Sequence, residues 1–192
     1  AAAVLRVGVG AAKGAAINLL AEAYTSRDKV SLVTFQGDAA QVILPPTRSI
    51  AMAKDRLERM PCGGGSPLAH ALNCAAQVGM TAQKSGDVGE VLVVCISDGR
   101  ANVPLCTSVG EEPEEPMDKA ALKEEVMNTA KLLGTLSGFK LLMLDTENKF
   151  VSTGVAKEIA AAAQGKYSYV PKATEGAVAQ VASQAISELK GM

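Results

Sequence analysis

The chain has 192 residues, of which 48% are hydrophobic and 20% are charged, and its formal net charge is −1. This length suits one domain with a well-buried core. The near-neutral charge excludes a global field that attracts nucleic acid or an anionic membrane, and three Tyr, three Phe and no Trp are too few for a base-stacking platform.

The first half of the chain alternates apolar, β-type runs with helical patterns. In chain order we expect a strand at 4–7, a helix at 11–26, strands at 29–35 and 41–44, and helices at 49–60 and 66–84. A turn at 36–38 joins the second and third strands directly. This predicts a hairpin, with one antiparallel strand at the edge of the sheet.

The second half continues the alternation. We expect a strand at 90–97, an irregular loop at 100–117, a helix at 118–136 followed by Gly138, a strand at 139–144 ending in Asp145, a helix at 152–164 closed by Gly165, a strand at 166–170 and a helix at 173–189. No internal repeat or domain boundary is visible, so residues 1–192 are expected to form one domain. The pattern predicts a three-layer, Rossmann-like α/β fold with a mostly parallel central sheet and one antiparallel edge strand.

Two stretches bring polar side chains to the carboxyl ends of strands, where open α/β sheets bind ligands. Ser66 follows three glycines and is expected to cap the next helix, with Pro67 at the first helical position. Asp98 follows the apolar strand 90–97. A hydroxyl and a carboxylate that converge there suit a hard cation or the acidic group of a partner. The alternatives are a plain helix cap at Ser66 and a strand-ending turn at Asp98.

The glycines Gly8, Gly10 and Gly14 resemble a dinucleotide-binding turn, which leaves a Rossmann-type nucleotide-binding enzyme as an alternative. That motif needs an acidic residue at the end of a parallel second strand. Here the second strand turns into a hairpin, and the nearest candidate, Asp38, lies in the turn. We therefore assign no cofactor-binding residue.

Cysteine and histidine spacing gives no zinc-type site, because Cys62, Cys74, Cys95 and Cys106 form no CxxC pair and His70 is the single histidine. Cys74 and Cys95 are expected to be small core residues in a reducing compartment. His70 is expected to be packed or at the surface. No Ser–His–Asp set is suitably spaced, so no catalytic residue is assigned.

Two further surfaces remain open to more than one interpretation. Asp145, Glu147 and Lys149 follow a strand at the same edge of the sheet, where they line a partner surface or only cap and solvate a loop. The acidic, proline-rich residues 107–117 are either a partner surface or a solvated linker. No apolar run approaches the length of a membrane span.

Four long blocks make the chain recognisable from about Lys13 to Met192. They are Val42–Lys54, Arg59–His70, Ser97–Arg100 and Leu144–Gly154. In these blocks the sequence closely resembles the C-terminal von Willebrand factor A (integrin I-like) domains of magnesium chelatase D subunits, in their plant or algal form.

The resemblance implies a subunit of the ligase that inserts Mg²⁺ into protoporphyrin IX during chlorophyll synthesis, with ATP hydrolysed only by partner modules. Its implied partners are an AAA+ motor subunit and a porphyrin-binding subunit, and the domain itself is implied to be a non-catalytic interaction module. The implied location is the chloroplast stroma, with no transit peptide in this chain. A general, extracellular and disulfide-bonded von Willebrand factor A adhesion module remains the alternative.

Such domains carry a metal-ion-dependent adhesion site built from three segments. By resemblance, Ser66 matches the second segment and Asp98 the third. The first segment, Asp-x-Ser-x-Ser, is absent, because the chain reads Arg6-Val7-Gly8-Val9-Gly10 and is about ten residues short there. Either the loop is deleted or residues are missing from this sequence. Since Mg²⁺ requires near-octahedral oxygen coordination, we expect Ser66 and Asp98 alone to bind it weakly or not at all.

Overall fold

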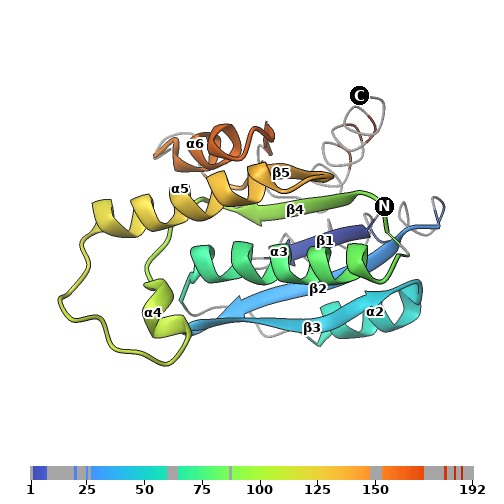
Figure 1. The fold of residues 1–192 in the computed structure, drawn as a ribbon, viewed down its shortest axis with the longest axis horizontal. Helices are drawn as coiled ribbons and strands as arrows, with labels where there is room; N and C mark the ends of the chain where they lie inside the picture. The colour runs from blue at the N-terminus through green and yellow to red at the C-terminus, as the bar shows by residue number, and fades with distance from the viewer. Residues whose placement is uncertain are drawn as a thin grey trace.

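The computed structural model describes residues 2–7, 20, 25, 27–59, 65–86, 88–147, 153–170, 180, 184 and 187. Its elements are β1 (Ala2–Val7), β2 (Lys29–Gln36), β3 (Ala39–Thr47), α2 (Ile50–Glu58), α3 (Leu68–Lys84), β4 (Val91–Ser97), α4 (Leu105–Ser108), α5 (Lys119–Thr135), β5 (Phe139–Asp145), α6 (Val155–Ala162) and β6 (Lys166–Tyr169). The strands form one sheet in the order β3-β2-β1-β4-β5-β6 (Figure 1).

The sheet is parallel except for its edge strand β3. β1 pairs in parallel with β2 and β4, and β5 pairs in parallel with β4 and β6, whereas β3 runs antiparallel to β2. The hairpin predicted from the turn at 36–38 is therefore confirmed, and Gly37 at its tip has φ +64°. The predicted α/β fold with one antiparallel edge strand is confirmed as well.

Helices cover both faces of the sheet. On one face α3 packs beside α5, and α5 beside α6, while α2 lies behind β2 and β3 (Figure 1). Every residue of β4 is buried, so side chains pointing to either face meet apolar neighbours. Val91, Val93 and Cys95 belong to the core cluster shared with α3, α5 and α6.

Three local boundaries differ from the expectation. The loop expected at 100–117 contains the short helix α4, which is too short to show a hydrophobic period in the sequence. The helix expected to end at Gly165 stops at Ala162, and the left-handed residue after it is Gln164, with φ +52°. The helices expected at 11–26 and 173–189 lie mostly outside the described residues.

The two other helix ends follow local chemistry. The Ser49 hydroxyl accepts the Met52 N–H at the start of α2, and the Asp118 carboxylate accepts the Ala121 N–H at the start of α5. Among the described residues, no helix combines the length and the apolar character required to cross a bilayer.

Candidate functional site

Two loops meet at the carboxyl-terminal edge of the parallel strands. One is the segment before α3 that contains Ser66, and the other follows β4 and contains Asp98 and Asn102. The Ser66 N–H donates to Asn102 Oδ1 at 2.6 Å, and the Asn102 N–H donates to the Ser66 carbonyl at 3.4 Å. The structure therefore places Ser66 beside the loop that carries Asp98.

Ser66 is not the helix cap that the sequence predicts. The cap of α3 is Pro67, which forms no side-chain hydrogen bond to the helix, and the helix begins at Leu68. The Ser66 carbonyl accepts the N–H groups of Leu68 and Asn102 instead. Pairing with a loop 36 residues away thus replaces the local cap, and among the described residues the Ser66 hydroxyl has no hydrogen-bond partner.

Gly65 holds this segment close to the hairpin tip. A Cβ at Gly65 would collide with the Gly37 carbonyl oxygen and would lie 2.8 Å from Val103 Cγ2. A side chain at this position would push Ser66 away from Asn102. The glycine is therefore required for close packing of two backbones, beside the loop that follows β4.

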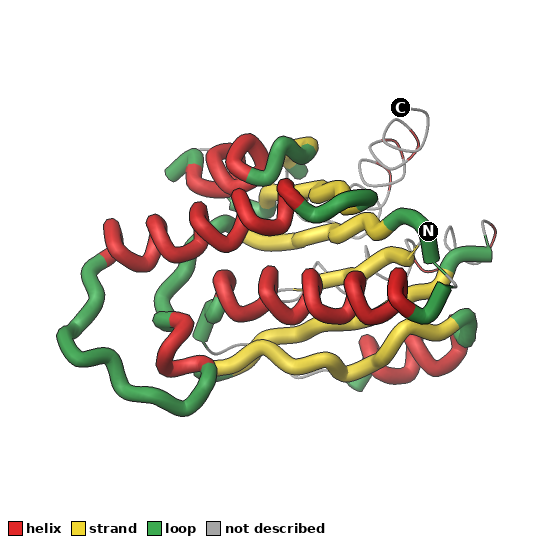
Figure 2. The backbone as a smooth tube through the Cα atoms, viewed as in Figure 1, coloured by secondary structure: helices red, strands yellow, loops and turns green. Residues whose placement is uncertain are grey.

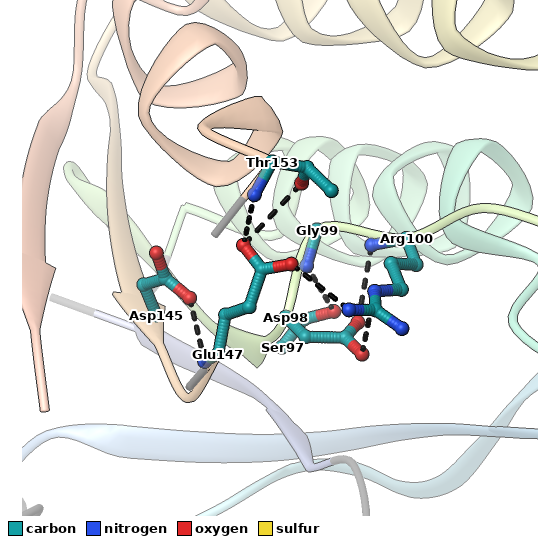
Figure 3. Close-up of polar contacts among 7 residues, drawn as sticks. All are labelled: Ser97, Asp98, Gly99, Arg100, Asp145, Glu147 and Thr153. Carbon is teal, nitrogen blue, oxygen red and sulfur yellow. Dashed lines mark hydrogen bonds and ion pairs between the residues drawn. The ribbon is translucent and has the colours of Figure 1, made fainter. Parts of the chain in front are cut away.

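Asp98 is engaged by Arg100 while remaining half-exposed. Its Oδ1 accepts the Arg100 N–H at 3.1 Å, and its Oδ2 lies 3.8 Å from Arg100 Nε (Figure 3). The Asp98 side chain is 42% exposed. The expected strand-ending turn is thus present, and the carboxylate still faces solvent.

Behind Asp98 lies a buried carboxylate, Glu147, whose side chain is only 2% exposed. It accepts hydrogen bonds from Arg100 Nη2 at 3.1 Å, from the Thr153 N–H at 2.7 Å and from Thr153 Oγ1 at 3.3 Å (Figure 3). Glu147 therefore joins the loop after β4 to the segment before α6. Burial of this charge is compatible with folding because it is both paired and hydrogen-bonded.

Asp145, at the end of β5, is buried as well, with 1% of its surface exposed. Its Oδ1 accepts the Glu147 N–H and its Oδ2 accepts the Tyr167 hydroxyl, both at 2.8 Å. Burial and this hydrogen bond to Asp145 raise the pKa of Tyr167 to about 12. The expectation that Asp145 and Glu147 solvate a loop is therefore wrong, although Asp145 does cap one. Lys149 lies outside the described residues.

Gly99 sets the distance between the loop after β4 and the start of α6. Its φ is +77°, and a Cβ there would lie 2.6 Å from the Ala156 backbone nitrogen. Neither strain is available to another residue at low cost, because both the conformation and the neighbouring backbone are fixed.

His70 is packed against the hairpin. Its Nδ1 accepts the Ala40 N–H at 3.0 Å, and partial burial lowers its pKa. A neutral imidazole that accepts a backbone hydrogen bond has a structural role, as expected from the sequence. Cys74, Cys95 and Cys106 are free thiols, while Cys62 lies outside the described residues, as do Gly8, Gly10 and Gly14.

The described oxygen donors fit a tightly held Mg²⁺ poorly. Ser66 and Asp98 are two ligands, and the Arg100 guanidinium already lies next to the Asp98 carboxylate. No group of three or more His, Cys, Asp or Glu residues suited to a metal occurs in the described part of the chain. Since Mg²⁺ demands near-ideal octahedral oxygen coordination, this donor set does not supply a complete site.

Several residues of the site were not singled out from the sequence. Arg100, Asn102, Thr153 and Tyr167 act through partners 15 or more residues away or, for Thr153, across a loop of six residues. The only available signal was the position of Arg100 and Asn102 directly after Asp98. Spacing along the chain cannot indicate which of these side chains meet.

The comparisons with known proteins agree with the geometry. A model of the von Willebrand factor type A domain matches residues 6–100. The chain is 43% identical over 182 residues to a magnesium-chelatase 67 kDa subunit from Heliobacterium mobile, and 36% identical over 177 residues to a magnesium-chelatase 60 kDa subunit from Cereibacter sphaeroides. These alignments cover 95% and 92% of the chain but only 26% and 29% of the two relatives.

A shorter relative and two solved structures extend the comparison. An uncharacterized protein of Methanocaldococcus jannaschii is 33% identical over 152 residues, covering 78% of this chain and 79% of that protein. The SpRpn10 VWA domain matches with a TM-score of 0.62 at 11% identity, covering 95% of this chain and 94% of that one. The PilB minor pilin of Streptococcus sanguinis matches with a TM-score of 0.67 at 12% identity, covering 98% and 60%. These two likenesses concern the fold alone.

Proposed function

The chain belongs to the von Willebrand factor type A family, and from this premise we propose that it is the assembly domain of a magnesium-chelatase D subunit. The chain spans about a quarter of the chelatase relatives it matches, so the activity of the whole enzyme is part of the proposal. In that enzyme the domain joins an AAA+ motor subunit to a porphyrin-binding subunit, and ATP hydrolysis drives insertion of Mg²⁺ into protoporphyrin IX. We place the complex in the chloroplast stroma by the same resemblance.

The observation that supports this proposal is the contact between Ser66 and Asn102. It holds two loops together at the edge of the sheet and leaves Asp98 and Arg100 half-exposed beside them. We name Ser66, Asp98, Arg100 and Asn102 the docking rim. An oriented carboxylate and guanidinium pair offers direction-specific hydrogen bonds to a partner surface.

The docking rim is proposed to act without a tightly bound metal. Arg100 already supplies positive charge next to Asp98, and the two described oxygen donors leave most of an octahedral shell unfilled. Mg²⁺ that binds here is therefore expected to be weakly held. ATP is expected to bind only in the AAA+ modules of the complex.

The two alternative functions receive less support from the structure. A nucleotide-binding Rossmann enzyme needs a parallel second crossover, whereas β3 is antiparallel to β2 and Asp38 lies in the exposed hairpin turn. A disulfide-bonded adhesion module is disfavoured because Cys74, Cys95 and Cys106 are free thiols.

The test is reconstitution of the complete magnesium chelatase with the D subunit carrying Asp98→Asn. Asn preserves the shape of the side chain and its bond to the Arg100 N–H but removes the charge. We expect the subunits to assemble about tenfold more weakly, a change of roughly 1.4 kcal/mol, with a parallel loss of magnesium-protoporphyrin formation at limiting D subunit.

The matched control is Asp55→Asn on α2, which removes an exposed carboxylate that pairs only with Arg59 one turn away. This variant should assemble like the wild type. Unchanged assembly of the Asp98→Asn complex, or equal loss in both variants, would contradict a docking role for the rim.

A further inference from the structure

A pocket of about 590 Å³ opens beside the docking rim, on the side away from Ser66. It lies between the loop after β4, the first turns of α5 and the segment that leads into α6. Its floor is apolar and includes Leu122, Val126 and Val155. This volume lies in the range of pockets that take a small molecule or a few side chains of a partner.

The charged residues of the pocket lining all carry the same sign. They are Arg100, Lys119 and Lys123, and no Asp or Glu of the described residues lines the pocket. Arg100 is oriented by Glu147, and Lys123 pairs with Glu158 at 2.7 Å. Lys119 is exposed and forms no ion pair within the described part of the chain. The pocket is thus a cationic rim around an apolar floor.

The complementary chemistry occurs in the same chain. Residues 111–117 read Glu-Glu-Pro-Glu-Glu-Pro-Met, and all four glutamates are exposed. The segment forms the long loop that leads into the first turn of α5 (Figure 2). No residue between 103 and 118 lines the pocket, so the loop leaves the pocket of its own chain open. We refer to residues 111–117 as the acidic loop.

We propose that the acidic loop of a second copy of this chain occupies the pocket. Its glutamates pair with Lys119 and with the free N–H groups of Arg100, while its prolines and methionine cover the apolar floor. Proline-rich segments lose little conformational entropy on docking because they are already extended.

Loop and pocket both lie at the amino-terminal end of α5, since the loop runs directly into Lys119. A twofold axis near this helix end therefore allows each copy to place its loop in the pocket of the other. Such an isologous contact closes at a dimer. Its small area and its reliance on ion pairs give a weak, salt-sensitive association.

The experiment is a charge exchange on the full chain, followed by sedimentation equilibrium at about 50 mM and about 500 mM salt. The loop variant replaces Glu111, Glu112, Glu114 and Glu115 with Lys, and the pocket variant is Lys119→Glu. Glutamate is favoured in the first turn of a helix, so the pocket variant is expected to fold. The matched control is Lys131→Glu, the same charge change at an exposed position later in α5.

We expect the wild type and Lys131→Glu to dimerise reversibly at low salt and to dissociate at high salt. Each of the two test variants alone should dimerise at least about tenfold more weakly, because like charges then face each other in both contacts. An equimolar mixture of the two should recover the wild-type affinity, since reversed loops meet reversed pockets. A wild type that stays monomeric at low salt, a pocket variant that dimerises normally, or a mixture that does not recover would overturn the proposal.

Discussion

Replacement of Glu147 by Gln tests the buried link that positions the docking rim. The Glu147 carboxylate accepts the Thr153 N–H with one oxygen and Arg100 Nη2 with the other. A glutamine amide offers one acceptor and one donor, so it must direct an NH₂ group at one of these donors. The side chain is 2% exposed, and water therefore cannot satisfy the group that loses its partner.

The magnitude follows from these contacts. A buried donor left without an acceptor costs about 1–3 kcal/mol, and the lost ion pair adds less than about 1 kcal/mol because Arg100 is half-exposed. We expect Glu147→Gln to lower the free energy of unfolding by about 2 kcal/mol. With a urea m-value of about 1–3 kcal/mol/M, the unfolding midpoint should fall by roughly 1 M.

Urea unfolding of the variant chain measures this effect, and Glu158→Gln is the control. Glu158 also pairs with a cation, Lys123, but both side chains are at least 40% exposed. Its loss should change the free energy of unfolding by less than about 0.5 kcal/mol. Equal, small effects of the two substitutions would refute the argument that Glu147 is a buried, fully used acceptor.

Three further predictions concern the same edge of the sheet. Gly99→Ala should destabilise the chain by at least about 2 kcal/mol in urea unfolding, whereas Gly86→Ala, with a similar φ of +76° but open space, should cost only about 1 kcal/mol. Because the pKa of His70 is lowered in the fold, the unfolded chain binds the proton first. The urea midpoint should therefore fall as the pH drops through about 6.5, and His70→Asn should flatten this dependence. Tyr167, with its pKa raised to about 12, keeps its proton longer in the fold than in the unfolded chain. Its contribution to stability should be lost between about pH 10 and 12, and Tyr167→Phe should remove that loss.

The sequence predicts the architecture because the fold depends on short-range patterns. The apolar run that became β4 and the direct turn between β2 and β3 each indicate their structure within about ten residues. The same holds for the cap at Ser49, where the hydroxyl bonds three residues ahead. These features need no knowledge of the rest of the chain.

The site was only partly predictable, because its contacts join distant segments. Ser66 looks like a helix cap until Asn102 engages its backbone, and Glu147 looks like a solvated loop residue until Arg100 and Thr153 surround it. The four-residue helix α4 is shorter than one hydrophobic period. In each case the deciding partner lies elsewhere in the fold or the segment is too short to show a pattern.

The most direct test of the docking rim is photo-crosslinking within the assembled chelatase. A benzoylphenylalanine at Ala101 lies between Arg100 and Asn102, whereas one at Met52, which is 52% exposed on α2, lies on another part of the surface. The account predicts a covalent product with another chelatase subunit from position 101 and none from position 52. Products from position 52 alone would contradict it.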